Sequence, residues 1–493
     1  MRALAPRGWF WTALAATLAF RLWLSAAVPV TADEAYFVLW GRHPGLGFYD
    51  HPPMVGWMLA PLVALSDSGW VARLPATLAP ALVALAVRAA LLAWFREDED
   101  TASLAALAAL LVPMNVWNVL VTTDTPLMLF SAGSLLVFAR AAERGSRAAF
   151  FCAGLLLGLA FLSKYFAVLL GLSYLAWAAS SRRWGAFLLV LLGALPFGLL
   201  NLYWNYDACW SNVMFNAINR HEGAGLSWAT PPLFLAAIAY LAAPLAWYAW
   251  RERSRLGWES PLRRALILSW LVPFAVFAAL SPVKRIGLHW LLSFMPALVL
   301  SAALALERRQ LAACARFFAV FAVLHAVAIA ALATMPLEAW SSSKLYSRLM
   351  FLIRAPELIV AASSGPYALA ADSYSTAAVL SFHARRDVPV FGRGSSHARH
   401  DDILTDWRRY AGSDLLVLQR EAPLPGDYRP FFREIELRQI PLGGAIFHAV
   451  LGRGFDYEAY RARVLTEVRE RYYRIPAWLP AGRCYFFERY FAK

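Results

Sequence analysis

Eleven apolar runs fill most of the first 335 residues, and they constrain the fold of this chain more than any other feature. A helix that crosses a bilayer needs about 20 apolar residues, or fewer where it is short or paired. Each run therefore predicts a membrane-spanning helix. The short fifth and sixth runs also fit a re-entrant hairpin. The runs are 9–30, 71–95, 102–121, 125–142, 148–162, 166–180, 184–204, 232–250, 265–280, 291–306 and 317–335.

Composition agrees with a membrane protein and divides the chain in two. Hydrophobic residues make up 60% of the chain and charged residues 16%, whereas about 25% of a typical soluble domain is charged. Residues 1–335 hold 24 basic and 15 acidic side chains, and the much shorter segment 336–493 holds 22 and 17. This change in density predicts a transmembrane domain over 1–335 and a soluble domain, whose own pattern is α/β, over 336–493.

Basic residues in the loops predict the orientation. With the N-terminus in the cytoplasm, 16 Lys and Arg residues fall on the inner side and six on the outer side before residue 336. Inner loops of membrane proteins carry such an excess, so the net charge of +14 is a topology signal and does not indicate nucleic-acid binding. An odd number of spans then places residues 336–493 outside. In a bacterium this means a multi-pass inner-membrane protein with a periplasmic C-terminal domain.

Four charged residues at the outer ends of the spans are unusual. The region 1–335 has 22 arginines but only two lysines, Lys164 and Lys284, and both fall on the outer side. Charges at a membrane edge indicate function by default, although interfacial anchoring is the alternative. Asp33 and Asp124 each adjoin an apolar span on the same face, where desolvation would increase the basicity of a carboxylate and suit a general base. The alternative for both aspartates is a helix cap.

The order of motifs in the outer loops resembles that of the polyprenyl-phosphate-sugar glycosyltransferases. These include protein O-mannosyltransferases, the lipid A aminoarabinose transferase and lipopolysaccharide galacturonic acid transferases. The likeness covers most of residues 1–300. It rests on DEAY at 33–36, YDHPP at 49–53, TDTPL at 123–127, FLSKY at 161–165, Trp204-Asn205 with Trp210, and Lys284 with His289-Trp290.

The resemblance implies a GT-C fold of about 11 transmembrane helices, with the active site at the outer membrane face and a soluble domain above it. Asp33 matches the acidic residue taken as the family's catalytic base. Asp50 and His51 match an acidic–basic pair whose basic member is a lysine near the carrier phosphate in the aminoarabinose transferase. Here that member is a histidine. Lys164 and Lys284 match basic positions in related sequences.

The expected site follows from this resemblance and from the residue chemistry. A lipid-linked sugar phosphate needs cations at the membrane edge, both to bind it and to stabilise the departing phosphate. An acceptor hydroxyl needs a base. We therefore expect catalytic roles for Asp33 and Asp124, and donor-phosphate binding by His51, Lys164, Lys284, Arg285 and, more weakly, Arg42. Substrate-loop roles are expected for Glu34, Tyr36, Asp50, Arg220, His221, His289 and Trp290.

The segment 336–493 alternates short apolar runs with polar helical patterns. Strands are predicted at 367–371, 388–391, 415–418, 434–440 and 445–451, and helices at 375–385 and 457–472. Asp372 and Tyr374 follow a strand end, a common position for sites in α/β sheets. The sequence HARHDD at 397–402 suits a metal site, but a solvated loop is the favoured interpretation. Four cysteines in 493 residues exclude a disulfide scaffold and show no zinc-ligand spacing.

These observations predict an inverting glycosyltransferase that moves a sugar from a polyprenyl-phosphate donor to an acceptor at the periplasmic face. Lipid A or lipopolysaccharide is the first choice of acceptor. A protein O-glycosyltransferase of the same fold, a transporter or flippase of lipid-linked sugars, and a membrane-anchored binding module are the alternatives. The sequence points to no particular cofactor, and no ligand spacing demands a metal, although a divalent ion at the carboxylates stays open as an alternative. The expected partners are the lipid-linked donor, a glycolipid or protein acceptor, and the bilayer.

Overall fold

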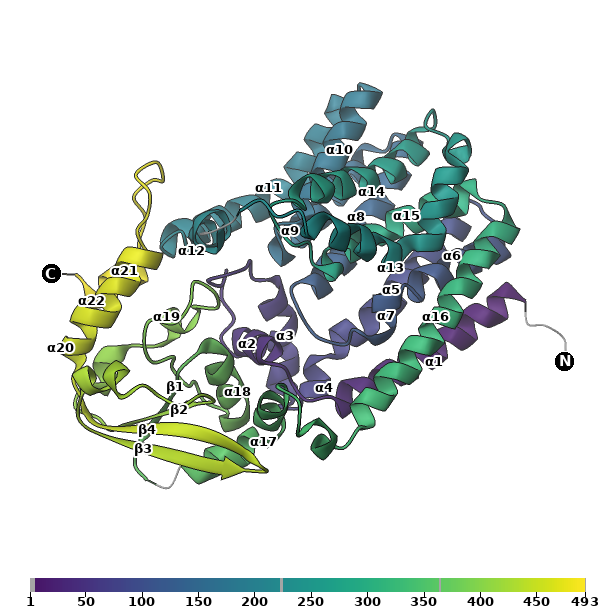
Figure 1. Ribbon diagram of the computed structural model, residues 1–493. Helices are drawn as coiled ribbons and strands as arrows, with labels where there is room; N and C mark the ends of the chain where they lie inside the picture. The colour runs from purple at the N-terminus through teal and green to yellow at the C-terminus, as the bar shows by residue number, and fades with distance from the viewer. Residues whose placement is uncertain (1–4, 222–224, 363–364, 493) are drawn as a thin grey trace. The chain divides into compact units, whose positions relative to one another are not determined.

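A computed structural model describes residues 5–221, 225–362 and 365–492 (Figure 1). The chain forms two compact units. The first comprises residues 1–28, 70–200 and 223–334, and the second comprises 29–69, 201–222 and 335–493. The segments 29–69 and 201–222, most of which lies between predicted spans, therefore belong to the same compact unit as the C-terminal segment. Helix α11 (Trp184–Asp207) runs from the first unit into the second.

The first unit is a helical bundle. Eight helical segments of the described chain are long and apolar enough to cross a membrane. These long segments are α1 (Pro6–Ala27), α4 (Gly69–Ala72) with α5 (Leu74–Ala93), α8 (Asp124–Arg144), α11, α13 (Thr230–Arg251), α14 (Pro261–Leu280), η4 (Leu288–Phe294) with α15 (Met295–Ala305), and α16 (Arg308–Thr334). The shorter helices of this unit are α6 (Glu99–Leu110), α7 (Pro113–Trp117), α9 (Arg147–Ser163), α10 (Ala167–Ser181) and η3 (Arg253–Leu256).

Every predicted apolar run overlaps a helix, but the run 102–121 is not a single span. Helix α6 ends at Leu110, and the short helix α7 begins at Pro113. A proline has no N–H and disfavours helical backbone in the residue before it, and Val112 accordingly has a non-helical ψ of 128°. The prediction of one continuous helix over 102–121 was wrong for this reason.

Small residues allow close helix contacts in the bundle. A Cβ atom added at Gly154 of α9 would lie 2.1 Å from the carbonyl oxygen of Val190 in α11, so only glycine permits this approach. Helix α8 ends at Gly145, which has a φ of 70°, and Ser146 then caps α9 by accepting a hydrogen bond from Ala149 N. This turn makes α8 and α9 an antiparallel pair that begins at Asp124 and ends next to Lys164.

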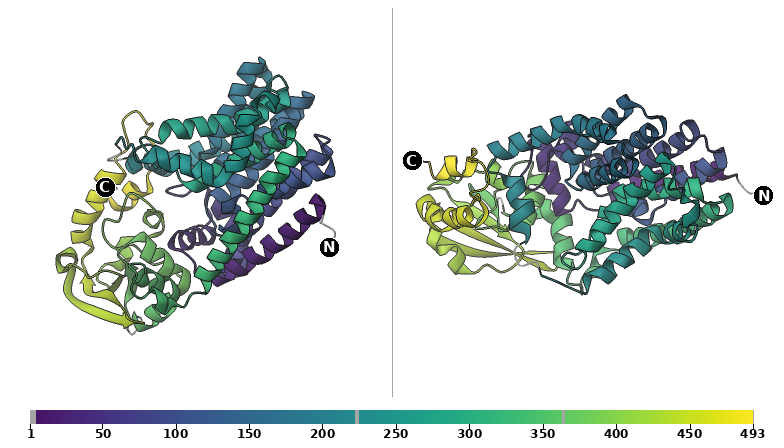
Figure 2. Two further views of the ribbon diagram at one scale, coloured as in Figure 1. Left: turned by 45° about the vertical axis from the view of Figure 1, so that its right-hand side comes forward. Right: turned by 90° about the horizontal axis from the view of Figure 1, so that it is seen from above.

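The second unit contains a four-stranded mixed sheet with the order β1-β2-β4-β3. Strands β1 (Ala368–Ala371) and β2 (Leu415–Gln419) are parallel, β4 (Ala445–Phe455) is antiparallel to β2, and β3 (Phe432–Leu442) forms a long hairpin with β4 (Figure 2). The predicted strand at 388–391 forms only an isolated bridge from Val390 to Ala371. Pro389 has no N–H to donate to a ladder, which explains why no strand forms there.

Helices of the second unit come from all three of its segments. They are α2 (Ala32–Arg42), α3 (Met54–Leu65), α12 (Ser211–Val213), η1 (Met214–Ile218), η2 (Asn219–His221), η5 (Leu337–Trp340), α17 (Tyr346–Ala362), α18 (Tyr374–Ala384), α19 (Asp401–Leu404), η6 (Trp407–Tyr410), η7 (Pro425–Asp427), η8 (Arg429–Phe431), α20 (Tyr457–Tyr460), η9 (Arg461–Leu465), α21 (Thr466–Tyr472) and α22 (Tyr485–Tyr490). Helix α18 packs on α2, so the segment 29–69 and the C-terminal segment share one core.

Candidate functional site

In the first unit, Asp124, Lys164 and His289 form a polar cluster. Lys164 Nζ lies 2.7 Å and 2.9 Å from the two carboxylate oxygens of Asp124, and His289 Nε2 lies 3.7 Å from Oδ2. Asp124 is the first residue of α8, Lys164 follows the last residue of α9, and His289 belongs to η4. Three predicted site residues that are far apart in sequence therefore meet here.

Aromatic rings enclose the ammonium group of this cluster. Lys164 Nζ lies 4.9 Å from the ring centre of Phe166 and 5.9 Å from that of Trp290, and only 11% of the side-chain surface of Lys164 is exposed. Lys164 is therefore not an exposed interfacial anchor. The helix-cap alternative for Asp124 is also wrong, because Thr123 occupies the N-cap position and the Asp124 carboxylate binds Lys164.

Lys284 and Arg285 lie in the turn between α14 and η4. The Arg285 side chain is exposed and Lys284 is half-buried. Predicted donor-phosphate residues thus occur in both units: Lys164, Lys284 and Arg285 in the first, and His51 and Arg42 in the second. That these five cations surround one phosphate stays a prediction.

In the second unit, a capping box fixes the start of α2. Thr31 Oγ1 accepts a hydrogen bond from Glu34 N, while Glu34 Oε2 accepts bonds from the backbone N and the hydroxyl of Thr31. Thr31 and Glu34 thus cap α2, so the cap alternative for Asp33 is wrong. The buried Glu34 has a structural role here, and no substrate-loop role follows from its position.

The Asp33 side chain projects from the first turn of α2 and is exposed. Its Oδ1 accepts a hydrogen bond of 3.4 Å from the hydroxyl of Tyr374, at the start of α18. The surrounding side chains therefore do not bury Asp33, contrary to the expected desolvation. Its carboxylate is accessible and accepts a hydrogen bond from a neutral hydroxyl. Tyr374 was singled out in the sequence for its place after β1, and the structure brings it to Asp33.

Tyr36 and Asp50 form the centre of a buried network in the same unit. The Tyr36 hydroxyl donates to Asp50 Oδ2 at 2.8 Å and accepts from His400 N at 3.1 Å. Asp50 Oδ1 accepts from Ala398 N at 3.0 Å. Burial raises the pKa of Asp50 to about 7, against the effect of the hydrogen bonds that Tyr36 and Ala398 donate.

Side chains from η1 and its neighbours hold the loop that carries Asp50 and His51. Asn216 Nδ2 donates to the Asp50 carbonyl at 3.0 Å, and Asn212 Nδ2 donates to the carbonyls of Phe48 and Tyr49. The half-buried His51 ring lies 6.5 Å from the ring of Phe215. The segment 201–222 thus positions the predicted acidic–basic pair, which sequence reasoning did not anticipate.

Arg220 belongs to this same segment. Its guanidinium donates to Asn216 Oδ1 at 3.1 Å and lies 5.3 Å from the ring centre of Phe215. Burial lowers the pKa of Arg220, and the charge of Asp50 opposes that effect. The side chain of His221, the next predicted loop residue, lies outside the described part of the structure.

Arg42 links α2 to α18. Its guanidinium donates to the carbonyls of Ser381 at 3.0 Å and Phe382 at 3.3 Å, and it forms an ion pair of 3.5 Å with Asp67. Asp67 also pairs with Arg385 at 3.2 Å. These contacts assign Arg42 a packing role, and binding of a phosphate would compete with them.

Apart from the exposed His397, the segment 397–402 is a largely buried polar network, so its interpretation as a solvated loop was wrong. Arg399 and Asp402 form an ion pair of 2.8 Å whose side chains are only 6% and 9% exposed. The Tyr473 hydroxyl also donates to Asp402 at 2.7 Å. Burial lowers the pKa of His400 to about 3, so this histidine is neutral at physiological pH. Among the described residues, no three His, Cys, Asp or Glu side chains are grouped as metal ligands.

A disulfide in the second unit joins Cys209 to Cys484. These cysteines are 275 residues apart, so their pairing had no local signal in the sequence. A second feature missed in the sequence is Arg21 within α1. Its buried guanidinium donates to the carbonyls of Ala76, Thr77, Asn115 and Asn118, which ties α1 to the helix ends around it.

Comparison with known proteins gives partial sequence matches and an extensive structural match. Residues 50–204, which include Asp124 and Lys164, match the family described as dolichyl-phosphate-mannose-protein mannosyltransferase. The lipid A galacturonosyltransferase RgtD of Rhizobium johnstonii is 30% identical over 156 residues, or 30% of this chain. The chain thus matches about a third (33%) of the length of that relative.

The structural match extends over almost the whole chain. ArnT from Cupriavidus metallidurans, solved with bound undecaprenyl phosphate, superposes with a TM-score of 0.63 at 16% identity, covering 90% of this chain and 98% of ArnT. The apo structure of the same protein gives a TM-score of 0.61 with the same coverage. The chain has the GT-C fold. This confirms the predicted fold class and the predicted resemblance to this group of glycosyltransferases, while the number of spans stays a prediction.

Proposed function

We propose that this protein is a membrane glycosyltransferase that moves a sugar from a polyprenyl-phosphate donor to a glycolipid acceptor at the periplasmic face. The observation that carries the proposal is the match to ArnT over 90% of the chain, because that protein was solved with undecaprenyl phosphate. The partial match to RgtD, a lipid A galacturonosyltransferase, supports lipid A or lipopolysaccharide as the acceptor.

Asp33 acts as the general base in this proposal. An acceptor hydroxyl attacks the anomeric carbon of the donor, Asp33 takes the hydroxyl proton, and the polyprenyl phosphate leaves from the opposite side with inversion. The exposed carboxylate on the first turn of α2 supports this role, because an accessible oxygen is needed to reach a substrate hydroxyl. The Tyr374 hydroxyl would orient the carboxylate through its hydrogen bond to Oδ1.

Lys164 is proposed to bind the donor phosphate, and Asp124 to hold the ammonium group in place. Aromatic rings enclose the ammonium group of Lys164, so its surroundings have a lower dielectric constant than water. Its attraction to a phosphate is therefore stronger than it would be in water. The phosphate gains charge as the sugar leaves, so a fixed cation stabilises the transition state. Lys284, Arg285 and His51 are the further proposed phosphate ligands.

The disulfide supports a periplasmic location for the second unit. Structural disulfides form in oxidising compartments such as the bacterial periplasm and are rare in the cytosol. The bond between Cys209 and Cys484 thus agrees with the orientation that the loop arginines predict. A reporter that is active only in the cytoplasm should be silent when fused after Lys493, and a strong signal would refute this orientation.

A protein acceptor is the second proposal, because the family that matches residues 50–204 is described as a protein mannosyltransferase. Mass spectrometry of the envelope of a deletion strain separates the two. Loss of a sugar from lipid A or lipopolysaccharide supports the glycolipid acceptor, and loss of a glycan from envelope proteins supports the protein acceptor. Loss of the envelope sugar, together with lipid-linked sugar that accumulates on the cytoplasmic face, would instead support a flippase.

A further inference from the structure

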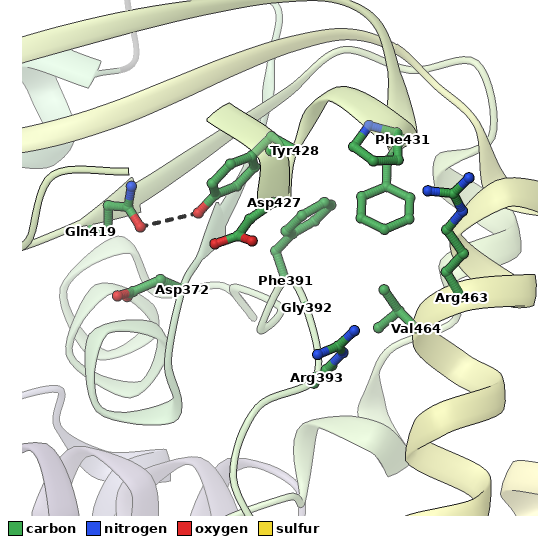
Figure 3. Close-up of a pocket in the computed structure, with 12 residues that line it drawn as sticks. Asp372, Phe391, Gly392, Arg393, Gln419, Asp427, Tyr428, Phe431, Arg463 and Val464 are labelled. Carbon is green, nitrogen blue, oxygen red and sulfur yellow. Dashed lines mark hydrogen bonds between the residues drawn. The ribbon is translucent and has the colours of Figure 1, made fainter. Parts of the chain in front are cut away.

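A cavity of about 440 Å³ lies within the second unit, between the carboxyl ends of β1 and β2 and the π-helical turn η9. Ligand pockets in proteins typically enclose about 300–1,000 Å³, so this volume is sufficient for one or two sugar rings. Its residues come only from the C-terminal segment, and none of them belongs to the expected transfer site. Its walls include Asp372, Phe391, Gln419, Tyr428, Phe431 and Arg463 (Figure 3).

Hydrogen-bonding groups gather at one end of the cavity. Asp372, Gln419, Asp427 and Tyr428 line this end of the cavity (Figure 3). Tyr428 donates to Gln419 Oε1 at 3.0 Å. Gln419 is only 8% exposed, and its Nε2 has no hydrogen-bond partner among the described residues. This end of the cavity therefore combines two carboxylates with an amide and a tyrosine hydroxyl.

Two arginines lie toward the other end of the cavity. Arg463 belongs to η9, and π-helical turns often occur at functional sites. Arg393 pairs with Glu467 at 2.6 Å, and both arginine side chains are largely exposed. Gly392, which lines the cavity beside Arg393, has a φ of 95°, a backbone conformation that favours glycine. This end of the cavity therefore offers two guanidinium groups to an anion.

Aromatic side chains form the wall between the two ends. The rings of Phe391 and Tyr428 are stacked with centroids 5.4 Å apart, and Phe431 packs edge-on against Phe391 at 6.0 Å. Carboxylates, an amide and a tyrosine hydroxyl are suited to the hydroxyl groups of a sugar ring, since each can donate or accept hydrogen bonds in fixed directions. An apolar wall is suited to the C–H faces of that ring.

We propose that this cavity is a binding site for a saccharide that carries an anionic group. The sugar hydroxyls bind Asp372, Gln419 and Asp427, and the phosphate or carboxylate binds Arg393 and Arg463. Asp33 does not line the cavity, so the site recognises a glycan without taking part in bond cleavage. That the saccharide belongs to the glycolipid acceptor rests on the proposed function.

Binding of a soluble probe to the full-length protein in detergent tests this proposal. The probe is the deacylated glucosamine disaccharide of lipid A with its phosphates, titrated by calorimetry, and inorganic phosphate and intact lipid A are measured in parallel. The wild-type protein should bind the disaccharide. Arg463→Met and Asp427→Asn should each weaken binding about tenfold or more, as expected for loss of a charge-assisted hydrogen bond.

Matched controls lie on exposed positions outside the cavity. Arg474→Met and Glu421→Gln should bind the disaccharide like the wild type. Equal affinities for inorganic phosphate and the disaccharide would refute saccharide recognition. Binding of intact lipid A without binding of the disaccharide would place recognition in the acyl chains and overturn the proposal. Wild-type affinity in both cavity variants would also overturn it.

The outcomes separate this proposal from the proposed function. A protein that binds the disaccharide in the cavity but transfers no sugar would refute the proposed function and leave the cavity site standing. A protein that transfers sugar normally but binds no disaccharide in the cavity would refute the cavity site alone.

Discussion

Asp124 and Lys164 form a bidentate ion pair in which both carboxylate oxygens lie within 2.9 Å of one ammonium nitrogen and each side chain is only 11% exposed. The two residues are 40 positions apart and are brought together by the antiparallel pairing of α8 and α9. A buried pair of this kind is costly to break from one side, because the remaining charge loses its closest counterion.

Lys164→Met should therefore reduce stability as well as donor binding. Removing one partner of a buried pair typically costs about 3–5 kcal/mol. The double variant Asp124→Asn/Lys164→Met should be more stable than Lys164→Met alone, because no charge is left unpaired. Thermal unfolding of the purified variants in detergent measures both. Strictly additive losses in the double variant would show that the pair does not couple.

Donor binding separates the role of Lys164 in the site from its role in folding. The double variant restores much of the stability but lacks the ammonium group. Its affinity for a polyprenyl-phosphate donor should therefore stay below that of the wild type. Wild-type donor affinity in the double variant would remove Lys164 from the phosphate site.

Asp50→Asn should change the pH dependence of stability. Burial raises the pKa of Asp50 from its ordinary 3.8 to about 7 in the folded protein. The contribution of a group with a raised pKa is full below the unfolded value and is lost as pH rises through the folded value. The Tm of Asp50→Asn minus that of the wild type should therefore increase between pH 5 and pH 8. A difference that stays constant over this range would contradict the raised pKa.

Tyr36→Phe should destabilise the second unit by about 1–3 kcal/mol, because His400 N and Asp50 Oδ2 each lose a buried hydrogen bond to the hydroxyl. The hydrogen bond from Tyr36 also lowers the pKa of Asp50, so its loss should raise that pKa further. Tm profiles against pH check both effects. Tyr367→Phe, a half-exposed tyrosine of the same unit, is a suitable control.

Cys209 and Cys484 should be oxidised in protein taken from the membrane. Only Cys152 and Cys314 should then react with a thiol-specific reagent under denaturing conditions, and all four cysteines should react after reduction. Loss of a native disulfide typically costs about 2–5 kcal/mol, so Cys484→Ser should lower the Tm. Four reactive thiols before reduction would argue against both the bond and the periplasmic location.

The helices could be predicted from the sequence because apolar length and proline position are local properties. All eleven apolar runs overlap a helix, and Pro113 marks the break that divides 102–121. Likewise Pro389 already indicated that 388–391 would not form a full strand. In both segments the missing N–H of the proline decides the local structure, although the hydrophobic pattern favours a continuous helix or strand.

The candidate site was only partly predictable, since its geometry depends on distant contacts. Asp33, Asp50 and Lys164 stood out by residue type and position, but their partners did not. Ala398 N lies 348 residues from Asp50, and Tyr374 lies 341 residues from Asp33. Nothing in a local pattern specifies such pairs, and the same holds for the disulfide.

The turnover of purified Asp33→Asn with a defined polyprenyl-phosphate-sugar donor and a lipid A acceptor tests the central claim most directly. Asp67→Asn, another acidic residue of the second unit, is the matched control and should keep its activity. Loss of a general base typically costs about 10²–10⁴-fold in rate. The proposed mechanism predicts a loss of that size for Asp33→Asn with an unchanged Tm, whereas turnover close to that of the wild type would contradict Asp33 as the base.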